Sequence, residues 1–190
     1  MAFLQFVQCE VIVESGKQAA AFEEIKTALK MDEHGRLILK GQEMVLLPRH
    51  FFRYILREVK DRAGQEVFHG IFYKAGFDGA LTFCTRYREI NGCSAHEAIE
   101  AYLGEMSARG WGAFDITRFV PDKGILEVAL RNSALVPEGD LPSGHLAWKG
   151  AMVGALRSLP EIAGDVALTA TIKETEDGCR ITVQPEPVKR

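Results

Sequence analysis

Residues 114–132 read FDITRFV-PDKG-ILEVALRN, and this stretch decides the fold class. Two runs rich in β-branched and apolar residues flank Pro121-Asp-Lys-Gly124, whose composition, with proline first and glycine last, is typical of a turn. The stretch therefore predicts an antiparallel hairpin. Two further hairpins are predicted, one over residues 35–47 and one over residues 166–184.

The segments between these hairpins carry helical patterns. Helices are expected from Pro48 to about residue 62, over residues 65–90, after the N-cap Ser94, and over residues 145–159. The elements are thus grouped as ββααα-ββ-α-ββ instead of alternating singly. This grouping favours the α+β class, an antiparallel sheet built from hairpins with helices packed on it.

The chain divides into three parts. Residues 1–34 are expected to form an N-terminal arm with a helix near residues 17–30, and its apolar stretch, residues 3–13, is a possible dimer contact. Residues 35–185 form the main domain, and residues 186–190 form a tail.

Composition and charge exclude several classes of protein. The chain has 190 residues, of which 47% are hydrophobic and 26% are charged, as expected for one compact domain. Its net charge of −3 offers no global attraction for nucleic acid or anionic lipid. No window approaches the roughly 18 apolar residues of a membrane span, and the start lacks a signal-peptide pattern. We expect a cytoplasmic protein with no membrane or nucleic-acid partner, and its four cysteines are expected to be free thiols.

Catalytic and cofactor motifs are missing from the sequence. It contains no dinucleotide-binding, P-loop or nucleophile-elbow pattern, so we expect no cofactor and no enzymatic activity. His96-Glu-Ala-Ile-Glu100 has a glutamate where a zinc protease helix needs its second histidine. The basic residues Arg49, Arg53, Arg57 and Lys60 share one helix face, which is either an anion site or, more commonly, a solvated surface.

Aromatic residues are spread over elements that must face one another. Most belong to the core, but glycines at 76, 79, 150 and 154 could leave room for a cavity, and apolar cavities are usual ligand sites. Gly76 and Gly79 could instead permit close helix approach or a kink. The candidate ligand-binding residues are Phe72, Tyr73, Phe83, Trp111, Phe114, Trp148 and Met152.

Several short stretches, taken in order, resemble the 4-vinyl reductase-type, or hydrocarbon-binding, domain family. They are Gly35-Arg-Leu, Gly41–Leu47, Gly64-Gln-Glu, Ile71–Gly76, Gly150–Gly154 and Asp177–Ile181, and the resemblance covers about residues 35–185. Pro48–Phe52 and Ser107–Phe114 are similar to a stand-alone bacterial branch of that family.

The resemblance implies a fold similar to vesicle-tethering subunits, a homodimer, and a buried pocket for a small hydrophobic or aromatic molecule, in a sensor or carrier role. Many members hold a structural zinc. At the corresponding positions this sequence has His145, Leu168, Thr171 and Cys179, and two ligands do not make a closed site, so no metal is expected. The alternatives are an accessory or reductase-like role in tetrapyrrole or one-carbon metabolism and a structural dimerisation module.

Overall fold

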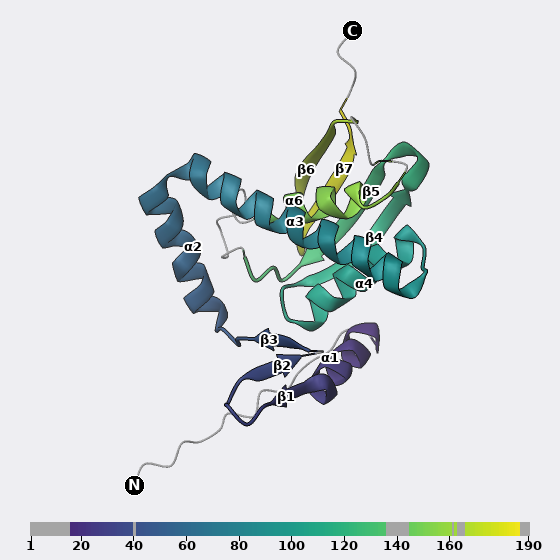
Figure 1. The fold of residues 1–190 in the computed structure, drawn as a ribbon. Helices are drawn as coiled ribbons and strands as arrows, with labels where there is room; N and C mark the ends of the chain where they lie inside the picture. Colours follow the sequence, from purple (N-terminus) through teal and green to yellow (C-terminus); the bar gives the residue numbers. More distant parts are fainter. Residues whose placement is uncertain (1–15, 40, 136–144, 161, 163–165, 187–190) are drawn as a thin grey trace.

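The computed structural model describes residues 16–39, 41–135, 145–160, 162 and 166–186 (Figure 1). Its helices are α1 (Gly16–Ala28), α2 (Arg49–Ala63), α3 (Gln65–Asn91), α4 (Ala95–Ala108), the short 3-10 helix η1 (Pro121–Lys123) and α6 (Leu146–Arg157). Its strands are β1 (Leu29–Met31), β2 (Leu37–Leu39), β3 (Gln42–Met44), β4 (Ala113–Val120), β5 (Ile125–Arg131), β6 (Leu168–Thr175) and β7 (Gly178–Pro185). The strands form two antiparallel sheets, of order β1-β2-β3 and β4-β5-β7-β6. The predicted α+β class is confirmed.

The central hairpin is the one predicted from residues 114–132. Strands β4 and β5 pair from Ala113↔Arg131 to Val120↔Ile125, and η1 connects them. Gly124 ends this connection at φ +60°, a left-handed conformation that glycine adopts without steric cost. Proline at the start of the turn and glycine at its end therefore have the roles expected of them.

The four-stranded sheet has one buried face. Along β5 the buried residues are Leu126, Val128 and Leu130, and they pair across the ladder with Val183, Ile181 and Cys179 of β7, which are also buried. The alternation is that of a sheet packed on one side. Leu168 and Ile172 of β6 pack against this core, whereas Val166 precedes β6 and is 43% exposed, so this hairpin begins two residues later than the predicted residue 166.

The N-terminal region contains a strand that the sequence did not predict. Helix α1 ends at Ala28, two residues earlier than expected, because Leu29–Met31 pairs with β2 in the register Leu29↔Leu39. The expected boundary at residue 34 therefore falls between two paired strands. The apolar stretch of residues 3–13 lies outside the described residues.

Helix α6 lies between α3 and the four-stranded sheet (Figure 1), and eight of its 12 residues are buried while none is exposed. Its close approach to α3 depends on glycine. A Cβ atom at Gly76 would lie 1.9 Å from the Ala147 carbonyl oxygen, and one at Gly150 would lie 2.0 Å from the Tyr73 carbonyl oxygen.

These contacts decide between the interpretations of the glycines. At Gly76, Gly150 and Gly154 the backbone of the facing helix occupies the space, so the expectation that they leave room for a cavity is wrong. Helix α3 runs without interruption for 27 residues, which favours close approach over a kink.

No helix in the described part of the chain combines the length and apolar character of a membrane span.

Candidate functional site

An apolar pocket of about 580 Å³ lies where α1 and the three-stranded sheet meet the start of α2 and the end of α4. The volume is in the range of sites for small organic molecules, roughly 300–1,000 Å³. The apolar residues that line it are Phe22, Ile25, Leu29, Leu39, Met44, Val45, Leu46, Leu47, Phe52, Ala108, Trp111 and Ala134. Several are exposed, including Val45 and Leu46 at 74% and 69%. An apolar ligand would cover surface that water now contacts, which favours binding.

Trp111 forms part of the pocket wall and belongs to an aromatic cluster. Its ring meets Phe52 edge-on at 5.4 Å and Trp148 at 6.1 Å, and Phe114 lies 4.8 Å from Trp148 on the far side. Edge-to-face pairs of this kind fix ring orientations beyond simple area burial. The wall is therefore braced from the core.

Hydrogen bonds also hold this wall in place. The Ala134 N–H donates to the Trp111 carbonyl oxygen at 2.8 Å, and the Trp148 indole N–H donates to the Ser133 hydroxyl at 3.1 Å. From α2, the Arg49 guanidinium donates to the Gly110 carbonyl oxygen at 2.7 Å, and Arg53 donates to the Ala134 carbonyl oxygen at 3.3 Å. The pocket wall is thus positioned by α2 and α6 together.

The polar side chains that line the pocket are Lys26, Arg49 and Arg109. Burial, followed by the nearby charge of Arg53, lowers the pKa of Arg49. Arg49 and Arg53 belong to the basic helix face identified in the sequence. They contact carbonyl oxygens of the 110 and 134 segments, so this end of the face is not only a solvated surface. Further along α2, Arg57 lies over the Tyr54 ring at 5.3 Å.

The structure brings three of the seven candidate ligand-binding residues together. Trp111, Phe114 and Trp148 form the cluster described above, but only Trp111 lines the pocket. Phe114 and Trp148 are buried behind it at 7% and 4% exposure. They support the wall.

Of the other four candidates, Met152 lies in the core, Phe72 and Phe83 are partly buried against it, and Tyr73 is half-buried. Phe72 contacts Phe68, Phe83 lies between Tyr87 and Tyr102, and Met152 on α6 is fully buried. The Tyr73 carbonyl faces Gly150. In the described residues these side chains do not line one common pocket with Trp111. Their role in ligand binding remains a prediction.

Sequence reasoning missed most of the lining. It placed residues 44–47 in a strand, but β3 ends at Met44, and Val45, Leu46 and Leu47 follow as an exposed apolar segment. Three consecutive apolar residues directly before Pro48 were the available signal, because proline makes the preceding residues extended and removes a ladder donor.

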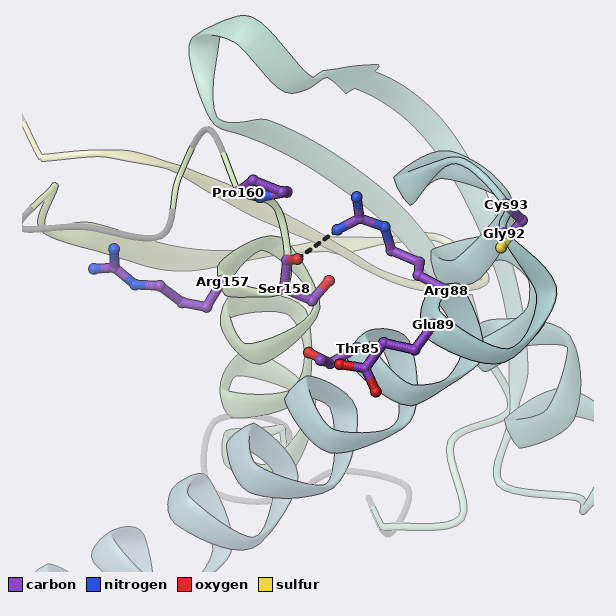
Figure 2. Close-up of a pocket in the computed structure, with 8 residues that line it drawn as sticks. All are labelled: Thr85, Arg88, Glu89, Gly92, Cys93, Arg157, Ser158 and Pro160. Carbon is purple, nitrogen blue, oxygen red and sulfur yellow. Dashed lines mark hydrogen bonds between the residues drawn. The ribbon is translucent and has the colours of Figure 1, made fainter.

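A second pocket, most of whose lining residues are polar or charged, lies at the C-terminal ends of α3 and α6 (Figure 2). Figure 2 shows Arg88 reaching Ser158, whose carbonyl oxygen accepts a 2.7 Å hydrogen bond from it. Arg157 donates to the carbonyl oxygens of Ile162 and Val166. Both arginines therefore donate hydrogen bonds to carbonyl groups at or beyond the end of α6. Cations near the C-terminus of a helix also stabilise it. This arrangement supports a structural role.

His145 and Cys179, at positions where the family that the sequence resembles holds a metal, do come together. Cys179 Sγ lies 3.7 Å from His145 Nδ1, and both residues are buried. Burial raises the pKa of Cys179 to about 11 and lowers that of His145 to about 4. Among the described residues, no group of three or more histidine, cysteine or acidic side chains could hold a metal. Absence of zinc remains a prediction for elemental analysis.

Two other sequence features show no catalytic arrangement. Burial raises the pKa of Cys84 to about 12, so its thiol is a poor nucleophile at neutral pH. His96 is exposed, stacks on Phe119 and lies 3.8 Å from Glu100. Its surroundings are those of a helix surface.

Comparisons with known proteins agree with this fold. A family described as a domain of unknown function (DUF5943) matches residues 24–117. Among solved structures, the phenol-responsive sensory domain of the transcription activator PoxR with phenol matches with a TM-score of 0.66 and 17% identity, covering 90% of this chain and 91% of that one. Subunit 3 of a trafficking protein particle complex from Naegleria fowleri, covalently bound to palmitic acid, matches with a TM-score of 0.45 and 13% identity, over 75% and 97% of the two chains. No curated protein matches. At these identities the likeness to the sensory domain establishes a shared fold.

Proposed function

We propose that this protein binds a small apolar or aromatic molecule in the pocket at Trp111, in a sensor or carrier role, as a member of the 4-vinyl reductase-type domain family. The observation that carries the proposal is the pocket itself, a concavity of about 580 Å³ with a mostly apolar lining. The fold shared with a phenol-responsive sensory domain supports it. No catalytic constellation is needed for this role.

Binding can be followed through the protein's own fluorescence. The chain has two tryptophans, of which Trp111 lines the pocket and Trp148 contacts it. Titration with phenol and with 4-phenyl-1-butanol should change the tryptophan emission with a saturable dependence. At 100 times its dissociation constant, a ligand should stabilise the fold by about 2.7 kcal/mol, a clear rise in melting temperature.

A matched pair of variants locates the site. Leu46 and Ile90 are exposed aliphatic residues, but only Leu46 lines the pocket. Leu46→Asn should weaken binding of 4-phenyl-1-butanol by about tenfold, because it removes an apolar contact with the ligand, and Ile90→Asn should leave it unchanged. Equal affinities in both variants, or no binding by the unmodified protein, would refute the proposal. Native mass spectrometry of freshly purified protein tests directly for a retained ligand.

We also propose that the protein is a homodimer. Helices α2 and α3 carry exposed large apolar or aromatic side chains outside the pocket, namely Phe51, Tyr54, Ile55, Val67 and Ile71. Figure 1 shows α2 and the first turns of α3 at one side of the molecule, away from the four-stranded sheet. Exposed apolar surface of this kind marks interaction sites in soluble proteins.

A further inference from the structure

The charged side chains that line the pocket are of one sign. Every charged side chain that lines the pocket in the described part of the chain is basic: Lys26, Arg49 and Arg109. The protein as a whole has a net charge of −3, so this local excess of positive charge runs against the overall balance. Such an arrangement attracts a negatively charged group through those cations that have no carboxylate partner.

Arg49 differs from the other two cations. Lys26 pairs with Glu23 at 2.7 Å, and Arg109 pairs with Glu105 at 2.9 Å. For Arg49, no carboxylate of the described residues lies within ion-pair distance, and its hydrogen bond goes to the Gly110 carbonyl oxygen. That bond uses one N–H of the guanidinium and fixes its position at the pocket. The other N–H groups can bind a ligand.

The backbone adds to this positive charge. Arg49 is the first residue of α2, and the N-cap is Pro48, which provides no side-chain acceptor. The first turn contains no acidic residue. The positive end of the dipole of this 15-residue helix is therefore not compensated by a side chain of its own first turn. Leu47, Arg49 and Phe52 place that end directly at the pocket.

We propose that the ligand of this pocket is an amphipathic carboxylate, with its apolar body against Trp111 and Leu46 and its carboxylate on the guanidinium of Arg49. This inference rests on the proposed function and specifies its ligand class. A carboxylate matches the planar fork of an arginine, and charge-assisted hydrogen bonds are the stronger kind. Because Arg49 is partly exposed, the carboxylate keeps part of its hydration, and the cost of removing it from water stays low.

The test compares two probes with the same apolar body. 4-Phenylbutyrate and 4-phenyl-1-butanol share a phenyl ring and an alkyl chain and differ in the charged head. Affinities for the full chain would be measured by calorimetry and tryptophan fluorescence at neutral pH. We expect 4-phenylbutyrate to bind about tenfold more tightly, and its affinity alone to fall as ionic strength rises.

Variants assign this preference to one residue. Arg49→Gln should abolish the tenfold preference, measured as the ratio of the two affinities within the same variant, because loss of the Gly110 hydrogen bond affects both probes alike. Arg49→Lys keeps the charge but loses the fork, so it should restore part of the preference. Arg57→Gln, a change of the same kind two turns along α2 and outside the lining, should behave like the unmodified protein. Melting temperatures of all variants check that each one folds.

The outcomes separate this inference from the proposed function. If both probes bind with equal affinity and Arg49→Gln changes nothing, the pocket binds apolar molecules and the carboxylate inference is overturned. If the preference survives in Arg49→Gln, the anion lies elsewhere and the inference is also overturned. If neither probe binds, the proposed function itself fails.

Discussion

Single glycines set the distance between the two central helices. Gly76 of α3 faces the Ala147 carbonyl, where a Cβ atom would lie 1.9 Å from oxygen, whereas a Cβ atom at Gly79 would meet nothing within 4 Å. Gly76→Ala should destabilise the fold by about 3 kcal/mol, because two helix backbones would have to separate. Gly79→Ala, one turn away, should be neutral or stabilising by up to about 1 kcal/mol. Urea denaturation measures both, and equal effects would contradict the packing described here.

The buried His145 makes stability depend on pH. Burial, with a smaller contribution from the charge of Lys149, lowers its pKa from 6.5 to about 4. Above pH 6.5 the imidazole is neutral in both states, and stability is complete. As the pH falls from 6.5 towards 4, the unfolded chain binds a proton that the folded protein resists, so stability declines by about 3 kcal/mol and then levels off.

Replacing the histidine isolates this contribution. The variant His145→Gln cannot titrate, so its stability should lack that decline between pH 6.5 and 4, measured by urea denaturation at a series of pH values. The difference between the two proteins removes the contribution of all other groups. Parallel pH profiles would show that His145 is accessible to protons in the folded state.

Residue-level prediction from the sequence succeeded where chemistry is local. Ser94 was identified as an N-cap, and it accepts a hydrogen bond from the Glu97 N–H while the Glu97 carboxylate accepts one from the Ser94 N–H. The glycines were harder, because a glycine between helices and a glycine beside a cavity look the same in sequence. Only the facing backbone distinguishes them.

At the scale of the element, the capping box fixes the start of α4. Ser94→Ala removes the hydroxyl that accepts from Glu97 and should cost about 1 kcal/mol. Thr82→Ala, at an exposed position in α3, is the control and should change stability by less than about 0.5 kcal/mol. The free energies of unfolding of the two variants test this prediction. A loss of stability in Thr82→Ala but not in Ser94→Ala would contradict the role of the capping box.

Elements with strong internal signals were predicted nearly to the residue. The β4–β5 hairpin, α2 and α3 follow the expected ranges within one or two residues. Strand β1 was missed because Leu29–Met31 has only three residues and is a strand only by pairing with β2. Its sequence also continues the apolar period of α1. Tertiary pairing overrides helix propensity there.

At the scale of the whole molecule, the pocket could not be predicted because no single segment carries it. Its lining comes from α1, the three-stranded sheet, the start of α2, the end of α4 and Ala134, which are distant in sequence. Aromatic content selected Trp111, which lines the pocket, together with Phe114 and Trp148, which are buried against it, and a role for any of them in ligand binding stays a prediction. Composition identifies apolar residues and leaves open which of them remain at a surface.

The exposed apolar side chains of α2 and α3 lead to the last prediction, which concerns association. A monomer would leave Tyr54 and Ile71 exposed by about half, and a second copy would remove this surface from water. Ile71→Glu places a charge where the partner is expected and should weaken the dimer by about a hundredfold, because an unpaired charge in an interface is costly. Ile90→Glu makes the same change near the other end of the same helix, at a position 80% exposed, and should leave association unchanged.

Light scattering and sedimentation at tens of micromolar should show a dimer for the unmodified protein and for Ile90→Glu, and a monomer for Ile71→Glu. A monomeric unmodified protein would refute the homodimer, and dissociation caused by Ile90→Glu alone would place its interface at the opposite end of α3.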